Sequence, residues 1–188
     1  MKPQAMGWLA ISLLLWSCAA LPPQEDAVVI ERPALPENGK VEVGKLYFDF
    51  AAPDLDGQTV RLSDLVGPRV VLVQVWGIRC APCLTEIAFL STLQRKYAGR
   101  GLQVVSVNTD RVDGPRLAQA LEARGLAPPY PILLDEDFAV TKHYTQWLIP
   151  VTVLIDRQGV VRSLHTGYRP ELDAVIEAEV EALLGGVR

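Results

Sequence analysis

Two cysteines separated by two residues stand where a hydrophobic strand pattern gives way to a helical one. The run reads Trp76-Gly-Ile-Arg-Cys-Ala-Pro-Cys83 and follows an apolar stretch that begins at Val70. This spacing lets both side chains meet on the first turn of a helix, where unpaired backbone N–H groups and the helix dipole favour a thiolate. The thiolate is the attacking species in disulfide exchange. The run therefore predicts redox chemistry on sulfur.

Cysteine number supports a working dithiol. The 188-residue chain holds 3 cysteines, and if Cys18 belongs to a targeting signal only Cys80 and Cys83 remain in the mature domain. A bridge between them closes a very short loop, which would constrain the unfolded chain little. Zinc sites usually take four protein ligands, or three and water, whereas the pair has only His143 and His165 to join it. We therefore expect no metal and no other cofactor, with inert core cysteines as the alternative.

The first residues read as a targeting signal. Residues 6–16 form an apolar stretch that is too short to span a membrane comfortably, and 1–18 is the predicted signal peptide. A small residue before Cys18 is similar to the lipobox of bacterial lipoproteins, although Trp16 departs from that pattern. Lipidation of Cys18, cleavage near Ala20 and an uncleaved anchor remain open. Each places the domain outside the cytoplasm, in a bacterial periplasm or at the cell surface, where disulfides persist.

Residues 19–43 combine prolines with acidic residues and show little apolar periodicity, which predicts an extended tether. A loop packed on the domain is the alternative. Residues 44–188 are long enough for one domain with a substantial core. With 49% hydrophobic and 21% charged residues the composition is globular. The net charge of -4 and scattered basic residues argue against nucleic-acid binding.

The hydrophobic pattern predicts alternating strands and helices. The expected elements are a hairpin of strands 47–50 and 59–62, strand 70–76, helix 83–97, strand 103–107, a helix from 113 to 125, strand 131–134, a short helix over 135–144, a hairpin of strands 151–155 and 160–164, and a helix over 172–183. Such an order predicts an α/β domain with a mixed sheet.

With these elements in order, residues 44–186 resemble the thioredoxin fold, and specifically the TlpA/ResA-like branch of extracytoplasmic thiol-disulfide oxidoreductases. The motifs that carry the resemblance are Ala52-Pro-Asp-Leu with Asp56-Gly57, then Trp76-x3-Cys-x-Pro-Cys83 with Glu86, then Ile149-Pro150-Val-Thr-Val-Leu-Ile-Asp156-x2-Gly159. The resemblance implies a thioredoxin-like fold, with a central mixed sheet flanked by helices and an N-terminal β-hairpin.

Within this resemblance, Cys80 is the expected nucleophile because it stands just ahead of the helix, and Cys83 is the expected resolving thiol. An acid at the position of Glu86 is linked to proton handling in this branch, and a carboxylate there can accept the proton of Cys83. A solvated acid at the helix N-terminus is the alternative. Thioredoxins proper have a buried Asp where this chain has Gln74. Since Gln74 cannot titrate, Glu86 is the remaining candidate proton carrier.

Four residues are expected at the substrate side of the dithiol. The resemblance implies a cis peptide before Pro150 and backbone pairing between Ile149 and an extended substrate segment. Arg79 replaces an aromatic residue common in the family, and it either favours the thiolate of Cys80 by its charge or is a solvated surface residue. Trp76 is expected beneath the dithiol, in a core role or a functional one.

The function implied is a membrane-tethered thiol-disulfide oxidoreductase. It would reduce extracytoplasmic proteins with cysteine pairs, for example in cytochrome c maturation, and be recharged by a membrane electron donor. One alternative is a peroxiredoxin-like peroxidase, which would require Thr where the chain has Gly77. Another is a copper-delivery protein of the Sco type, whose cysteines are three residues apart rather than two.

Overall fold

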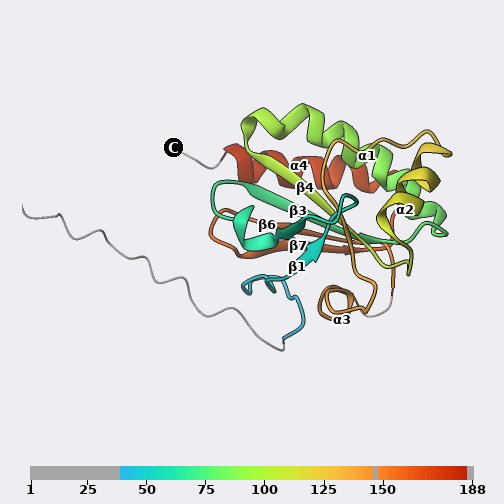
Figure 1. Cartoon of the computed structure of the whole chain (residues 1–188). Coiled ribbons are helices and arrows are strands. Elements are labelled where there is room, and N and C mark those ends of the chain that lie inside the picture. The colour runs from blue at the N-terminus through green and yellow to red at the C-terminus, as the bar shows by residue number, and fades with distance from the viewer. Residues whose placement is uncertain (1–38, 146–147, 186–188) are drawn as a thin grey trace, which may run out of the picture. The chain divides into compact units, whose positions relative to one another are not determined.

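The computed structural model describes residues 39–145 and 148–185. A five-stranded mixed sheet, in the order β5-β4-β3-β6-β7, forms the centre of the domain, with helices α1 and α4 stacked on one face of it (Figure 1). In chain order the elements are β1 (Ala51–Pro53), β2 (Thr59–Arg61), η1 (Leu62–Asp64), β3 (Val70–Trp76), α1 (Ala81–Tyr97), η2 (Ala98–Arg100), β4 (Leu102–Asn108), α2 (Gly114–Glu122), β5 (Ile132–Leu134), α3 (Thr141–Tyr144), β6 (Val151–Ile155), β7 (Val161–Thr166) and α4 (Leu172–Gly185). This confirms the predicted thioredoxin-like α/β class.

Strand β3 is the middle of the sheet and all of its residues are buried. It pairs in parallel with β4 and antiparallel with β6, so it has a neighbour on each edge and a packed layer on each face. Strands in this position read as near-continuous apolar runs. Gln74 is the only polar side chain in the strand, and its burial calls for a partner.

Alternate residues along β3 pack into two different apolar clusters, one on each face of the sheet. Val70 and Leu72 pack under α1 and α4, in a cluster that includes Ile176. Val71 and Val73 face the opposite way, into a cluster covered by the chain segment before β1, the β1–β2 hairpin and α3. This period of two places Gln74 on the helix side of the sheet, beneath α1.

The N-terminal hairpin is present, but its first strand is not the predicted one. Residues 47–50 were expected to form it, whereas β1 pairs with β2 through Ala51 to Pro53. Tyr47 and Phe50 are buried in the core instead, and the segment pairs with the β6–β7 hairpin through an isolated bridge between Leu46 and Val160. Burial of the aromatic rings in the core therefore displaces the strand toward the turn.

The helix predicted over 135–144 is reduced to the four residues of α3. The carboxylate of Asp135 accepts hydrogen bonds from the backbone N–H groups of Val140, at 3.1 Å, and Thr141, at 2.7 Å. Phe138 has a φ of 61°, which a helix does not accommodate. A turn closed by the Asp135 side chain thus takes the place of the first helical turns.

Within residues 39–43, the described end of the predicted tether, Val41 packs on the domain, whereas Val43 is 59% exposed. Val41 is buried, and its N–H donates to the carbonyl oxygen of His143 over 2.9 Å. The Gly44 N–H likewise donates to the carbonyl oxygen of Val161 at 2.8 Å. Val41 thus joins the core beside α3, while the tether over 19–43 stays a prediction. The predicted signal peptide, Cys18 and the rest of the tether lie outside the described residues.

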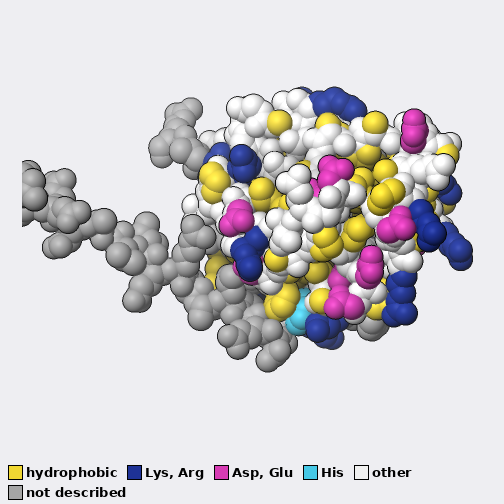
Figure 2. All heavy atoms as spheres, in the orientation of Figure 1, with side chains coloured by type: hydrophobic (Ala, Val, Ile, Leu, Met, Phe, Trp, Pro, Cys, Tyr) yellow, Lys and Arg dark blue, Asp and Glu magenta, His cyan; other side chains and the backbone are white. Residues whose placement is uncertain are grey.

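On the face shown in Figure 2, acidic and basic side chains are interspersed rather than gathered by sign. Extended nucleic-acid contacts require a coherent basic surface, and this face does not provide one. Within residues 39–145 and 148–185, none of the helices has both the length and the apolar composition that crossing a bilayer demands.

Candidate active site

The two cysteines form a disulfide at the start of α1. Cys80 is the N-cap residue, with an extended backbone, and its Sγ accepts a hydrogen bond of 3.3 Å from the N–H of Cys83. Pro82 stands in the first turn, where a missing N–H costs no intrahelical bond. Sulfur here replaces the oxygen that usually caps a helix, so the first-turn amides and the positive end of the helix dipole are directed at Cys80.

The two sulfur-bearing residues differ in access. Cys83 is completely buried, whereas Cys80 is half-buried. Arg79, just before it, is exposed. A partner protein can therefore reach Cys80 but not Cys83. The roles of Cys80 as attacking thiol and Cys83 as resolving thiol remain predictions, with which this difference in access is compatible.

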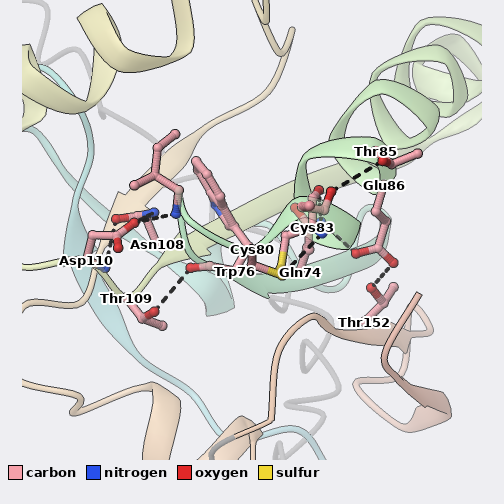
Figure 3. Close-up of a disulfide and its surroundings, with 12 residues drawn as sticks. Gln74, Trp76, Cys80, Cys83, Thr85, Glu86, Asn108, Thr109, Asp110 and Thr152 are labelled. Carbon is pink, nitrogen blue, oxygen red and sulfur yellow. Dashed lines mark hydrogen bonds between the residues drawn. A yellow bond between two sulfur atoms is a disulfide. The ribbon is translucent and has the colours of Figure 1, made fainter. Parts of the chain in front are cut away.

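The loop that carries Cys80 is held by residues that follow β4. The Asp110 carboxylate accepts from the N–H of Ile78 at 2.6 Å and from the side-chain amide of Asn108 at 2.8 Å. Thr109 contributes a backbone N–H to the carbonyl oxygen of Trp76 at 2.9 Å. Figure 3 shows this group beside the disulfide. Sequence reasoning missed it, although polar residues directly after a strand parallel to β3 are the signal that points to this edge of the sheet.

Glu86 lies one turn along α1, and only 1% of its surface is exposed. The Thr152 hydroxyl donates to its Oε1 at 2.6 Å, and the Gln74 amide donates to its Oε2 at 2.6 Å (Figure 3). Burial raises the pKa of Glu86 above its ordinary value of 4.5, while the bonds from Thr152 and Gln74 and the charge of His165 act in the opposite direction. The solvated-acid alternative for Glu86 is therefore wrong.

Gln74 connects the cysteine helix to this carboxylate. Its Nε2 donates to Glu86 and also lies 3.5 Å from the carbonyl oxygen of Cys83. Its Oε1 is the one buried side-chain nitrogen or oxygen of the described residues that lacks a hydrogen-bond partner. Gln74 thus contacts the Glu86 carboxylate and the backbone of Cys83, the two residues of the predicted proton transfer.

Comparison with known proteins agrees with this geometry. The AhpC/TSA family matches residues 43–164. The thiol-disulfide oxidoreductase ResA of Geobacillus kaustophilus is 33% identical over 147 residues, which cover 78% of this chain and 81% of the relative. ResA of Geobacillus thermodenitrificans is 34% identical over 131 residues, covering 70% and 73% of the two chains. The chain belongs to the AhpC/TSA family as a ResA-like thiol-disulfide oxidoreductase.

Solved structures extend the similarity to the fold of the ResA-like protein. The crystal structure of a putative thiol:disulfide interchange protein DsbE from Chlorobium tepidum has a TM-score of 0.71 and 31% identity, and the match covers 78% of this chain and all 100% of that one. The solution structure of a putative protein disulfide isomerase from Bacteroides thetaiotaomicron has a TM-score of 0.70 and 25% identity, covering 80% and 95%.

The loop before β6 faces the disulfide of the ResA-like protein. The peptide between Ile149 and Pro150 is cis, as the resemblance implied. Ile149 is half-buried and packs against the apolar cluster that includes Cys83, where Cys80 also packs, and Pro150 is buried. A Cβ on Gly77 would lie 3.2 Å from Cδ1 of Ile149, so the two loops are close together. Backbone pairing of Ile149 with a substrate remains a prediction.

Trp76 belongs to the core and not to the substrate surface. It is fully buried in the cluster that contains Cys83 and Ile87, and its Nε1 donates to the Ser106 hydroxyl at 3.2 Å. Its inclusion among the substrate-binding residues is not supported by this position. The core role, in which the indole supports Cys83 from beneath, is the one that the structure favours.

The histidines of the ResA-like protein are engaged away from the cysteines. His143 stacks on Phe48, with its Nδ1 3.0 Å from the carbonyl oxygen of Gly39, and His165 lies 2.9 Å from Glu179. Within the part of the chain that the structure describes, no group of three His, Cys, Asp or Glu side chains is placed to hold a metal ion.

Proposed function

We propose that the ResA-like protein is a membrane-tethered reductase of disulfides in extracytoplasmic proteins, apocytochrome c being one candidate substrate. The observation that carries the proposal is the unequal access of the two cysteines, with Cys80 half-buried at a helix N-terminus and Cys83 sealed behind it. This arrangement lets the protein attack a partner and then release it without exposing the second thiol.

The exchange proceeds in two steps. The Cys80 thiolate attacks one sulfur of the substrate disulfide, forming a mixed disulfide and releasing the other substrate sulfur as a thiolate. Cys83 loses its proton to Glu86 and attacks Sγ of Cys80, which closes the Cys80–Cys83 bond and releases the second substrate thiolate. Two electrons pass to the substrate, and the two thiolates take up protons from Glu86 and solvent. A membrane electron donor then reduces the disulfide again.

The raised pKa of Glu86 suits this role. A base that is buried and thereby made less acidic holds a proton more firmly than a surface carboxylate does. It can accept the thiol proton of Cys83 and pass it on when the substrate leaves. Its anchoring by Thr152 keeps the acceptor in place through both steps.

Electron direction is tested by the reduction potential of the Cys80–Cys83 couple, equilibrated with glutathione. A potential of about -270 mV, as for thioredoxin, supports a reductase. A potential of about -120 mV, as for the oxidant DsbA, overturns the proposed direction of electron flow. Cys80→Ser should abolish reduction of a protein disulfide. Cys83→Ser should retain attack and accumulate mixed disulfides, which a nonreducing gel detects.

Tethering is proposed to depend on lipidation of Cys18, which falls outside the described residues. Radiolabelled fatty acid should enter the wild-type protein and not Cys18→Ala, and the variant should move from the membrane fraction to the soluble fraction. Label in both proteins, or a membrane-bound variant, would exclude lipidation of Cys18 as the anchor. The comparison uses the full chain expressed in a bacterium.

No observation favours the peroxidase or copper-delivery alternatives. The position that a peroxidase of this fold fills with Thr is Gly77, and it lies against Ile149 with little room for a side chain. Neither histidine is joined to the cysteines.

A further inference from the structure

A row of polar side chains crosses the sheet beneath α1, one from each of four adjacent strands. Ser106 of β4 is paired in register with Gln74 of β3, Gln74 with Thr152 of β6, and Thr152 with His165 of β7. Residues directly opposite each other in a sheet point to the same face. The row therefore lies on the helix side, where apolar residues stand before and after it.

Glu86 reaches this row at its middle. Its two oxygens accept from Thr152 and Gln74, the two central members. His165 is paired with Thr152, which hydrogen-bonds to Glu86, and it lies on the neighbouring strand and on the same face of the sheet. Opposed residues in antiparallel strands have Cα atoms about 4.5–5.5 Å apart, so an imidazolium at this place lies close enough to influence the carboxylate in a poorly hydrated region.

His165 is held in place from α4. Its Nε2 lies 2.9 Å from Oε2 of Glu179, and the same oxygen accepts from the Ser163 hydroxyl at 2.7 Å. The His165 side chain is 18% exposed and that of Glu179 is 31% exposed. The imidazole is therefore partly accessible to solvent, whereas Glu86 is sealed.

We propose that His165, positioned by Glu179, sets through its charge how readily Glu86 takes up the proton of Cys83. This inference rests on the proposed function, in which Glu86 is the proton acceptor. His165 touches neither sulfur nor substrate and acts as a positioning residue.

The charged groups around Glu86 determine in which direction its pKa moves when the charge of His165 is removed. Positive charge on His165 lowers the pKa of Glu86, and negative charge on Asp173 of α4 raises it. The phenols of Tyr130 and Tyr168 also interact electrostatically with Glu86. Burial, together with the negative charge of Glu86, raises the pKa of both phenols, so they stay neutral. His165 is the one cation acting on Glu86 among these groups. Removing its charge must therefore make Glu86 a weaker acid.

The test follows the second step of exchange directly. The reduced protein is mixed with an aromatic disulfide, 5,5′-dithiobis(2-nitrobenzoate), and the second release of thionitrobenzoate reports attack by Cys83. The rate is measured against pH for wild type, His165→Gln and His165→Lys. His165→Gln should move the midpoint of the profile to higher pH and slow resolution at acid pH about three- to tenfold, less than the loss of a general base itself.

Two controls separate charge from structure. His165→Lys keeps a cation at all these pH values, so its midpoint should stay at or below that of wild type. His143→Gln removes the other histidine, which stacks on Phe48 and bonds to Gly39 away from Glu86, and its profile should match wild type. Equal slowing by both His165 variants with an unchanged midpoint would show a structural role only and overturn the inference, as would an unchanged His165→Gln profile.

Infrared difference spectra make the inference distinguishable from the proposed function. The protonated-carboxyl band that disappears in Glu86→Gln reports titration of Glu86 without any turnover. If His165→Gln moves the midpoint of this titration to higher pH while Glu86→Gln leaves the rate of resolution unaffected, the charge coupling is supported and the role of Glu86 in exchange is contradicted. If Glu86→Gln blocks resolution and the band does not move in His165→Gln, the inference falls and the proposed function stands.

Discussion

The hydroxyl of Thr152 donates a 2.6 Å hydrogen bond to Oε1 of Glu86 and so joins the first turns of α1 to the strand that follows the cis-proline. Both residues are buried. The bond links the element that carries the cysteines to the element expected to receive substrate. It also makes the protonation of Glu86 depend on a side chain that is 66 residues away in sequence.

Thr152→Val should shift the pH dependence of disulfide resolution. The substitution keeps the side-chain shape and removes the donor that lowers the pKa of Glu86, so Glu86 should be protonated up to a higher pH. Resolution near neutral pH should slow about three- to tenfold, because a protonated carboxyl cannot accept the proton of Cys83. Stopped-flow measurement of resolution against pH gives the result. Thr92→Val, on the exposed side of α1, is the control, and identical profiles for the two variants would contradict the assignment.

Glu86→Gln should stabilise the oxidised protein in a pH-dependent way. Since the folded-state pKa of Glu86 is raised above 4.5, protonation favours the folded state, and this advantage is lost as the pH rises through the folded pKa. The variant cannot titrate, so its free energy of unfolding relative to wild type should increase with pH. Denaturant titrations at about pH 4.5 and pH 8.5 measure the difference. Glu122→Gln, on an exposed helical position, should show no such trend; a constant offset for both would refute the buried-acid explanation.

Gly77→Thr should impair reduction without creating a peroxidase. The added Cβ would lie 3.2 Å from Cδ1 of Ile149 and 3.5 Å from Oγ1 of Thr109, so the Ile149 side chain beside Pro150 must move by a few tenths of an ångström. We expect kcat/KM for a protein disulfide to fall roughly tenfold, since small misplacements at a reacting site are costly. Gly99→Thr adds the same side chain where nothing lies within 4 Å and should retain activity. Peroxide turnover by the Gly77 variant would revive the alternative class.

Gly114→Ala should destabilise the fold through a backbone clash. A Cβ at this first residue of α2 would lie 2.1 Å from the carbonyl oxygen of Leu55, and a backbone atom cannot move aside as a side-chain end can. Overpacking of this kind costs about 1–3 kcal/mol, measurable by urea denaturation. Gly99→Ala meets nothing within 4 Å and should be neutral or stabilising by less than about 1 kcal/mol. Equal stability of the two variants would show that α2 can shift away from Leu55.

The cysteine pair and the sheet that supports it could be predicted because their signals are local. The strand 70–76 is a continuous apolar run and the dithiol opens a helix directly after it. The hairpin around Asp156 and Gly159 likewise follows from turn chemistry between two short strands, and β6 and β7 lie where that pattern indicates. In each case the residues that decide the structure are neighbours in the chain.

Tertiary structure alone decided the environment of Glu86. The sequence places this residue three positions after Cys83 but leaves open whether it is solvated, because burial depends on what α1 packs against. Gln74, Thr152 and His165 come from three different strands, and only sheet register brings them into one row beside the carboxylate. The two cysteines are close in sequence and lie on one helical turn, so the sequence alone predicts them. The pKa of Glu86 depends instead on desolvation and on hydrogen-bond partners that only the folded sheet brings together.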